Sequence, residues 1–147
     1  KAPAPKKSIP GVGKFIAGDS EYQQNLSDLL KSWQDYNTQN QQGRGDIKTA
    51  FQTTMQRMGD EKSKALQSLQ DDFASRGLLN SGLYGQAVSD YTDQYGNTVN
   101  DATTSEQQQL RDLQQALQSQ RNTYSTNKQD LRQQAIRKRA EQYGIKT

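Results

Sequence analysis

Carboxylates are the side chains of this sequence best suited to chemistry, because it contains no cysteine and no histidine. Disulfides, zinc–thiolate sites, cysteine nucleophiles and a histidine acid or base are therefore excluded. Acids cluster at Asp71 and Asp72 and at Asp90, Asp93 and Asp101, in patterns that invite an acid/base or metal hypothesis. They lie among glutamines and serines, without the apolar surroundings that shift a pKa. We interpret them as solvated helix faces and expect no catalytic residue, bound metal or cofactor.

Two short motifs superficially suggest ligand binding. Gly11-Val12-Gly13-Lys14 is reminiscent of a phosphate loop, but Phe15 follows the lysine where serine or threonine is needed, and no strand precedes it. Arg44-Gly45-Asp46 matches the tripeptide of integrin ligands, although a break between helices explains the same glycine and aspartate. We therefore predict neither nucleotide binding nor cell adhesion.

The composition is poor in apolar residues for a chain of this length. Of 147 residues, 30% are hydrophobic, and the mean hydropathy is −1.14. Ordering each residue costs about 1 to 2 kcal/mol of conformational entropy, which burial of apolar surface must offset. We expect the helices of this chain to bury part of that surface against partners.

Hydropathy and net charge indicate neither a membrane span nor a nucleic-acid partner. No apolar run reaches the roughly 20 residues that span a bilayer, so we expect a soluble chain. The net charge of +3 and the isoelectric point of about 9.1 are too mild to indicate nucleic-acid binding by themselves. Because the sequence begins at Lys1, its start is either a processed terminus or the boundary of a segment.

The first half of the sequence predicts an arm followed by helices. Residues 1–18 contain all three prolines and four lysines, which favours an extended arm that docks on a partner. Asp19 or Ser20 occupies the position of a helix N-cap. We predict a helical segment over 19–76, interrupted near 41–46 and 59–60 by glycines, each of which costs a helix roughly 1 kcal/mol.

The second half predicts a corner and one long helix. Residues 77–82 follow Arg76, and a glycine after a cation in the last turn is a strong helix stop. Large residues then recur at steps of three and four from Tyr84, which predicts a helix over 83–147. Gly96, Asn97 and Asn100 mark its weakest point, and a break at 96–100 would give two helices of ordinary length.

The fold class predicted by these patterns is all-α, as an elongated helical hairpin or a coiled-coil-like bundle with a Pro/Lys-rich N-terminal arm. Two sets of residues should form interfaces. One is an amphipathic stripe in the first helix, and the other is a core around the corner. The stripe consists of Tyr22, Leu26, Leu29, Trp33 and Tyr36. The corner core consists of Leu66, Leu69, Phe73, Leu78, Leu79 and Leu83.

A basic segment near the C-terminus is the only candidate for contacts with phosphates. It contains Arg137, Lys138 and Arg139, which could bind nucleic acid by simple electrostatics. The alternative, which we favour, is that cations in the last turns of a helix complement its dipole and remain solvated. No ladder of aromatic residues for stacking on bases accompanies the segment.

Several phrases of the sequence together resemble one family. They are Ile9-Pro10-Gly11, the helix start Ala17-Gly18-Asp19-Ser20-Glu21-Tyr22-Gln23-Gln24, the corner Asp72-Phe73-Ala74-Ser75-Arg76-Gly77-Leu78-Leu79-Asn80-Ser81-Gly82, and the closing Arg137-Lys138-Arg139-Ala140-Glu141-Gln142-Tyr143. The chain resembles small, glutamine-rich helical virion proteins of tailed bacteriophages, particularly those of actinobacteria. Such proteins are structural or minor tail components, and the resemblance implies no enzymatic role.

The resemblance implies a structural component of a tailed-phage virion, in the tail or connector region, assembled in the host cytoplasm. We expect a homo-oligomer whose helices pack against each other and against other virion proteins. Two alternatives remain. One is a nucleic-acid-associated internal or ejected virion protein that uses the basic C-terminal end, and the other is a scaffolding protein or assembly chaperone.

Overall fold

Two long α-helices make up nearly all of the structure, a computed structural model that describes residues 16–144. Helix α2 covers Ser20–Ser75 and helix α3 covers Gly82–Gln142. The two helices pack against each other without any strand among the described residues, so the predicted all-α helical hairpin is confirmed. Residues 1–15, and with them most of the predicted arm and the Gly11–Lys14 motif, lie outside the described part of the chain.

The start of α2 follows from its capping residue. The Tyr22 amide donates a hydrogen bond of 3.1 Å to Asp19 Oδ1, which identifies Asp19 as the N-cap, and Glu21 lies in the first turn beside the positive end of the helix dipole. Ile16 and Ala17 are helical and Gly18 is in a turn. The prediction of an extended arm is therefore wrong for residues 16–18. Ile16 packs against Ala135 of α3, and this contact holds the segment in place.

The corner is a Schellman motif at the end of α2. Gly77 adopts a φ of 70°, a conformation that favours glycine. The Gly77 amide donates to Ala74 O at 3.0 Å and the Leu78 amide donates to Phe73 O at 2.8 Å, the two hydrogen bonds that define this helix end. Ser81 Oγ then accepts a hydrogen bond of 3.4 Å from the Tyr84 amide and caps α3. The helix stop predicted at Gly77 is thus present.

The predicted helix breaks are wrong. Helix α2 continues through 41–46 and 59–60, and Asp46 is an ordinary helical residue instead of a cap. Helix α3 also continues through 96–100. A helical glycine costs about 1 kcal/mol relative to alanine, which neighbouring turns that pack against the opposite helix can offset. The integrin-type tripeptide at 44–46 is therefore part of a helix and not a loop.

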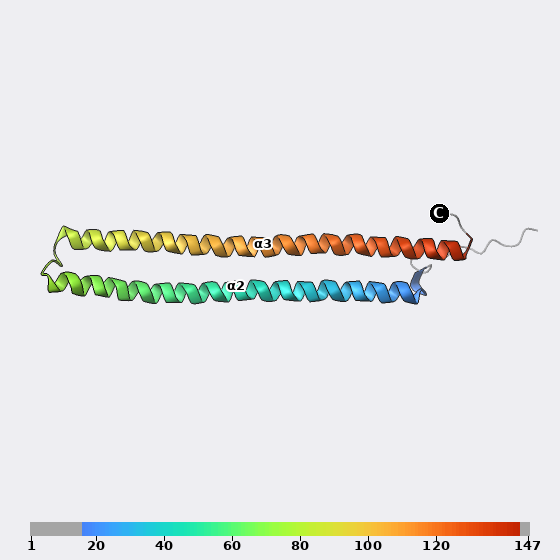
Figure 1. Cartoon of the computed structure of the whole chain (residues 1–147), viewed down its shortest axis with the longest axis horizontal. Coiled ribbons are helices and arrows are strands. Elements are labelled where there is room, and N and C mark those ends of the chain that lie inside the picture. Colours follow the sequence, from blue (N-terminus) through green and yellow to red (C-terminus); the bar gives the residue numbers. More distant parts are fainter. Residues whose placement is uncertain (1–15, 145–147) are drawn as a thin grey trace, which may run out of the picture. The chain divides into compact units, whose positions relative to one another are not determined.

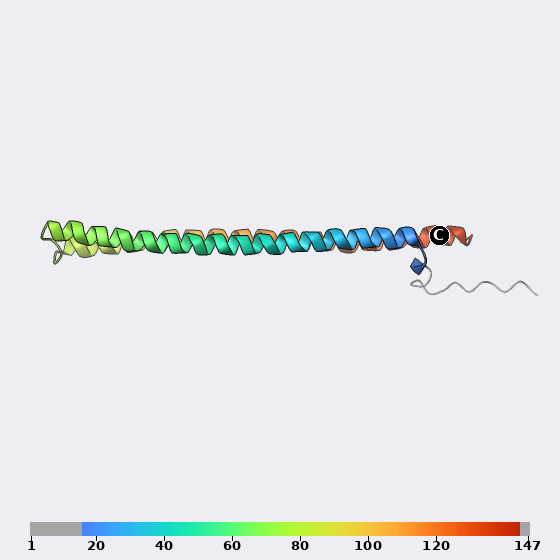
Figure 2. The ribbon, with the colours of Figure 1, turned by 90° about the horizontal axis from the view of Figure 1, so that it is seen from below.

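The chain divides into two compact units, and each contains a segment of both helices. Unit 1 comprises Lys1–Gln39 with Ala116–Thr147, and unit 2 comprises Asn40–Gln115. Within each unit the α2 segment lies beside the α3 segment (Figures 1 and 2). In unit 1, Trp33 pairs with Tyr124, whereas Glu21, nearer the start of α2, pairs with Lys138, nearer the end of α3. The segments are therefore antiparallel.

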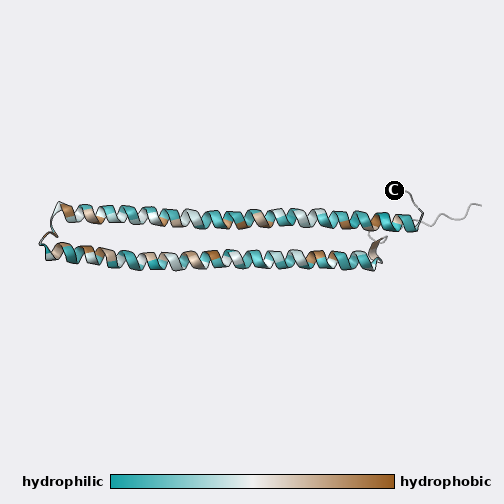
Figure 3. Ribbon diagram, viewed as in Figure 1, coloured by the Kyte–Doolittle hydropathy of each residue, from teal (hydrophilic) through white to brown (hydrophobic). Residues whose placement is uncertain are grey.

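Very few side chains of the described residues are buried. The buried apolar residues are Ile16, Met58, Ala135 and Ala140, and no side chain is fully enclosed. Hydrophilic residues cover most of both helices (Figure 3). Two helices that pack along a single line bury one narrow stripe each, which explains the thin core. Within residues 16–144, neither helix has an apolar stretch long enough to cross a membrane.

Candidate functional site

The seam between α2 and α3 gathers most of the residues that the sequence predicted for interfaces. In unit 1, the predicted stripe of Tyr22, Leu26, Leu29, Trp33 and Tyr36 is half-buried throughout. The Trp33 ring stacks on Tyr124, with centroids 5.8 Å apart and an interplanar angle of 20°. Such stacked pairs stabilise by about 0.5 to 1.5 kcal/mol beyond the area that they bury. The stripe thus lies on the face of α2 that meets α3.

The seam of unit 2 relies on aromatic and cation–π contacts near the corner. The Phe73 and Tyr84 rings have centroids 5.4 Å apart at an interplanar angle of 53°. Farther from the corner, Lys62 Nζ lies 4.7 Å from the centroid of the Tyr95 ring. Leu66 and Leu69 are half-buried between these two contacts. The corner core therefore includes the predicted α2 residues.

Two leucines at the corner lie outside the core that the sequence predicted. Leu78 is half-buried, but Leu79 is 39% exposed and Leu83 is 63% exposed. The prediction that Leu79 and Leu83 pack into the corner is wrong. The reason is geometric, since Leu79 lies in the turn and α3 presents Tyr84, one residue after Leu83, to Phe73. Leu79 and Leu83 are large apolar side chains that this chain leaves in contact with solvent.

A polar contact interrupts the seam of unit 2 near its boundary. Asn40 is 5% exposed, and its Nδ2 donates a hydrogen bond of 2.8 Å to the Leu113 carbonyl oxygen. One turn later, a Cβ on Gly43 would lie 3.3 Å from Leu113 Cδ1, so glycine permits a close approach here. Asn40 Oδ1 and Arg44 Nε are buried without a hydrogen-bond partner. A buried asparagine in a helical seam commonly specifies register at a cost in stability.

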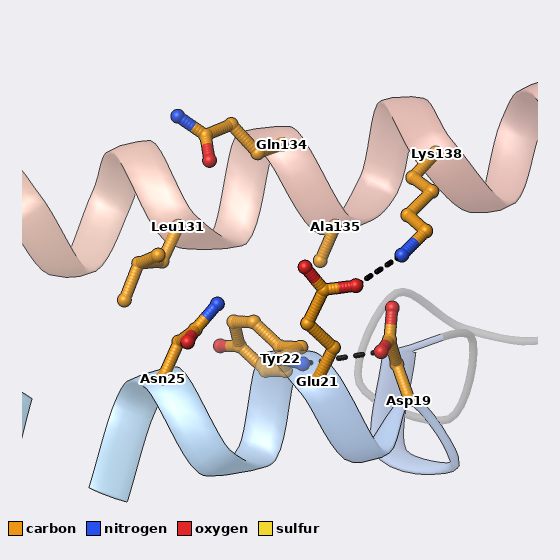
Figure 4. A pocket seen from close by; sticks show the side chains of 8 residues that line it. All are labelled: Asp19, Glu21, Tyr22, Asn25, Leu131, Gln134, Ala135 and Lys138. Carbon is orange, nitrogen blue, oxygen red and sulfur yellow. Dashed lines mark hydrogen bonds and ion pairs between the residues drawn. The ribbon is translucent and has the colours of Figure 1, made fainter. Parts of the chain in front are cut away.

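The part of unit 1 where α2 begins and α3 ends holds a small apolar cluster beside an ion pair. Ile16 and Ala135 are buried together, and Tyr22 packs against them. Lys138 Nζ donates to the Glu21 carboxylate across the seam (Figure 4). The hydrogen bond and the charge of Glu21 raise the pKa of Lys138 above its ordinary value. Both side chains are more than half exposed, so the pair adds little stability.

The basic tripeptide of the C-terminal end is not one surface. Consecutive helical residues project about 100° apart, so Arg137, Lys138 and Arg139 point in three directions. Lys138 pairs with Glu21, and Arg139 donates to Gln142 Oε1 at 3.3 Å. A different set of cations does share one face of α3. The sequence reasoning grouped the basic residues by their place near the C-terminus and did not pick out this face. Its signal is the spacing of seven, four and seven residues between Arg121, Lys128, Arg132 and Arg139.

The acidic residues considered for chemistry lie on exposed helix surfaces. Asp71, Asp90, Asp93 and Asp101 are exposed. Asp72 lies 3.4 Å from Arg76 in an ion pair within α2. Among residues 16–144, no group of three or more acidic side chains is arranged to hold a metal ion.

A groove runs along one side of the seam in unit 1. Three hollows form it, and neighbouring hollows share lining residues from both helices; the middle one has a volume of about 450 Å³. Figure 4 shows the hollow nearest the helix ends, where Tyr22 and Ala135 lie between the helices. The groove takes charged side chains from both helices and from the N-cap of α2, namely Asp19, Glu21, Asp28, Asp130 and Lys138. We call it the acidic groove.

Comparison of the chain with protein-family models, curated proteins and solved structures finds no match.

Proposed function

We propose that this chain is a structural component of a tailed-phage virion, in the tail or connector region, that packs its helices against further copies and against other virion proteins. The observation that carries the proposal is the scarcity of buried apolar residues, four among the described residues, beside exposed leucines at Leu30, Leu79 and Leu83. A hairpin of two helices gains little from so thin a seam, and helices of this length depend on packing for stability. Further burial against partners supplies what the seam lacks.

The resemblance to glutamine-rich helical virion proteins supports the assignment to a phage particle. Its two most distinctive phrases coincide with the structural determinants of the fold, the N-cap at Asp19 and the Schellman corner at Gly77. A resemblance that extends to the capping residues supports a shared hairpin design as well as a shared composition.

Two other functions receive less support. A nucleic-acid-associated protein that uses Arg137, Lys138 and Arg139 is less favoured, because these side chains diverge and Lys138 is paired with an acid. A scaffolding protein would use the same helical surfaces, and it differs only in leaving the particle before maturation.

The decisive experiment is quantitative mass spectrometry of gradient-purified mature particles from the phage that encodes this chain, alongside the whole infected-cell lysate. A constant number of copies per particle is expected, whatever the purification. Abundance in the lysate with absence from mature particles would overturn the proposal in favour of a scaffold. Loss from particles on release of the genome would instead indicate an ejected protein.

A further inference from the structure

The two sides of the seam in unit 1 differ in charge and in surface shape. On one side lies the acidic groove, whose middle hollow is lined by Asp28 from α2 and Asp130 from α3. Among residues 16–144, Lys138 is the only cation that lines the three hollows, and it is paired with Glu21. This side therefore presents unneutralised carboxylates around a concave surface.

The opposite side presents a leucine and a row of cations. Residues two apart in a helix project about 160° apart. Leu30 therefore points away from the groove that Asp28 lines, and it is 41% exposed. By the same geometry, Lys128 and Arg132, each two residues from Asp130, point away from the groove on α3, and both are exposed.

Arg121 lies seven residues before Lys128, and Arg139 lies seven after Arg132, so both continue the row along the same face of α3. Arg139 is half-buried, with its Nε buried and its Nη2 close to Gly18, so it is not part of the exposed surface. We call the exposed surface the basic ridge; it consists of Leu30, Arg121, Lys128 and Arg132.

We propose that the basic ridge of one copy docks into the acidic groove of a second copy, side by side and in the same direction. Leu30 would enter the middle hollow, where Leu29 and Leu131 supply apolar walls. Lys128 and Arg132 would then lie beside Asp28 and Asp130 of the neighbouring copy. Opposite charges around an apolar anchor are the arrangement that fixes register in a protein interface.

The ridge and the groove lie at the same level along the helices. Trp33 stacks on Tyr124, which aligns these two residues across the seam. Leu30 precedes Trp33 by three residues, and Lys128 follows Tyr124 by four. Because the two segments are antiparallel, both displacements point in the same direction along the seam. The hollow at Asp28 and Asp130 is level with them. Two copies can therefore meet without a shift along the helix axis.

The proposed contact joins two different surfaces, so each added copy leaves one ridge and one groove open until a ring closes. The inference deepens the proposed function, since it names a second copy of this chain as the partner that unit 1 fits. We therefore expect an oligomer of more than two chains whose formation weakens with added salt.

Charge reversal of the full chain tests the contact. Asp28→Lys with Asp130→Lys reverses the groove, and Lys128→Glu with Arg132→Glu reverses the ridge. Each double variant alone should associate at least about a hundredfold more weakly in sedimentation velocity, because like charges then oppose each other. An equimolar mixture of the two should associate again, since a positive groove meets a negative ridge and a negative groove meets a positive ridge.

Matched controls keep the net charge of each variant but move the change to exposed residues of unit 2. Asp60→Lys with Asp71→Lys matches the groove variant, and Lys48→Glu with Lys64→Glu matches the ridge variant. Both controls should associate as the native chain does. Leu30→Gln tests the apolar anchor without a change of charge, and it should weaken association about tenfold. Circular dichroism should show native helicity for every variant.

Association of both reversal variants at native strength, or no recovery in the mixture, would overturn the inference. The proposed function would survive that result if the chain is still found in mature particles, so the two failures are distinguishable. A short DNA duplex serves as the probe for the rival partner. Salt-sensitive binding of the duplex that is lost in the ridge variant, with self-association unchanged, would assign the ridge to nucleic acid and overturn the contact between copies.

Discussion

Asn40 reaches across the seam and donates a hydrogen bond of 2.8 Å from its Nδ2 to the carbonyl oxygen of Leu113, in the middle of α3. The Asn40 side chain is buried and its Oδ1 has no partner. Burial of an unsatisfied polar atom costs about 1 to 3 kcal/mol, whereas a net hydrogen bond returns about 1 kcal/mol. Asn40 is therefore a net cost to stability that is consistent with a role in register.

Asn40→Leu should raise the free energy of unfolding by about 1 kcal/mol, because it replaces an unsatisfied amide with an apolar group of similar size. The variant should also populate more than one register of the two helices, which would be visible as doubled amide resonances in its NMR spectra. Urea unfolding monitored by circular dichroism measures the stability change. A variant less stable than the native chain would contradict the argument.

Gly43→Ala should stabilise the chain less than Gly45→Ala does. Both glycines are in the interior of α2, where alanine is favoured by about 1 kcal/mol. A Cβ at Gly43 meets Leu113 Cδ1 at 3.3 Å, whereas a Cβ at Gly45 has no atom within 4 Å. Thermal unfolding of the two variants compares them directly. Equal stabilisation would show that Leu113 moves aside without cost.

Trp33→Ala should destabilise the chain by about 2 kcal/mol, because it removes a large half-buried side chain and its stacking contact with Tyr124. A double-mutant cycle with Tyr124→Ala isolates the ring contact, for which we expect a coupling of about 0.5 to 1.5 kcal/mol. Additive effects of the two substitutions would contradict direct stacking in solution.

Lys138→Met should lower the melting temperature slightly at neutral pH, through loss of the ion pair with Glu21. The pKa of Lys138 is raised above its ordinary value of 10.5 by that pair. The folded state thus holds the proton more tightly than the unfolded state. The stabilisation is present in full below pH 10.5 and is lost as the pH rises through the raised folded value. Melting curves of both chains should therefore converge at strongly alkaline pH.

Leu79→Asp should block incorporation into particles while leaving the helicity of the isolated chain unchanged. Leu79 is in the exposed turn, so the substitution should alter the free energy of unfolding by less than about 0.5 kcal/mol. Complementation of a deletion phage followed by particle purification measures incorporation. Native levels of Leu79→Asp in particles, with native helicity, would exclude the corner as an assembly surface.

The ends of the helices were predictable because they depend on neighbouring residues. The cap at Asp19 and the stop at Gly77 act through hydrogen bonds that span three to five residues, and the sequence shows both partners at once. The apolar stripe from Tyr22 to Tyr36 was predictable for the same reason, since its spacing alone selects one face of a helix.

The continuity of the helices was not predictable from local rules. Glycines at 43, 45 and 59 each weaken a helix by an amount that a few packed turns outweigh, and that packing comes from residues far along the chain. The same limit explains Leu79 and Leu83, whose exposure depends on which side of α3 meets Phe73.

The sequence by itself determined a helical chain with a corner at 77–82, an amphipathic stripe in each half and too few apolar residues for a thick core. Those properties follow from composition, capping and spacing within a few turns. Only the tertiary structure decided that Trp33 meets Tyr124, that Asn40 meets Leu113, and that Asp28 and Asp130 line the same hollow of unit 1. These pairings depend on the register and rotation of two helices whose contacting residues are up to 117 positions apart, which no local pattern specifies.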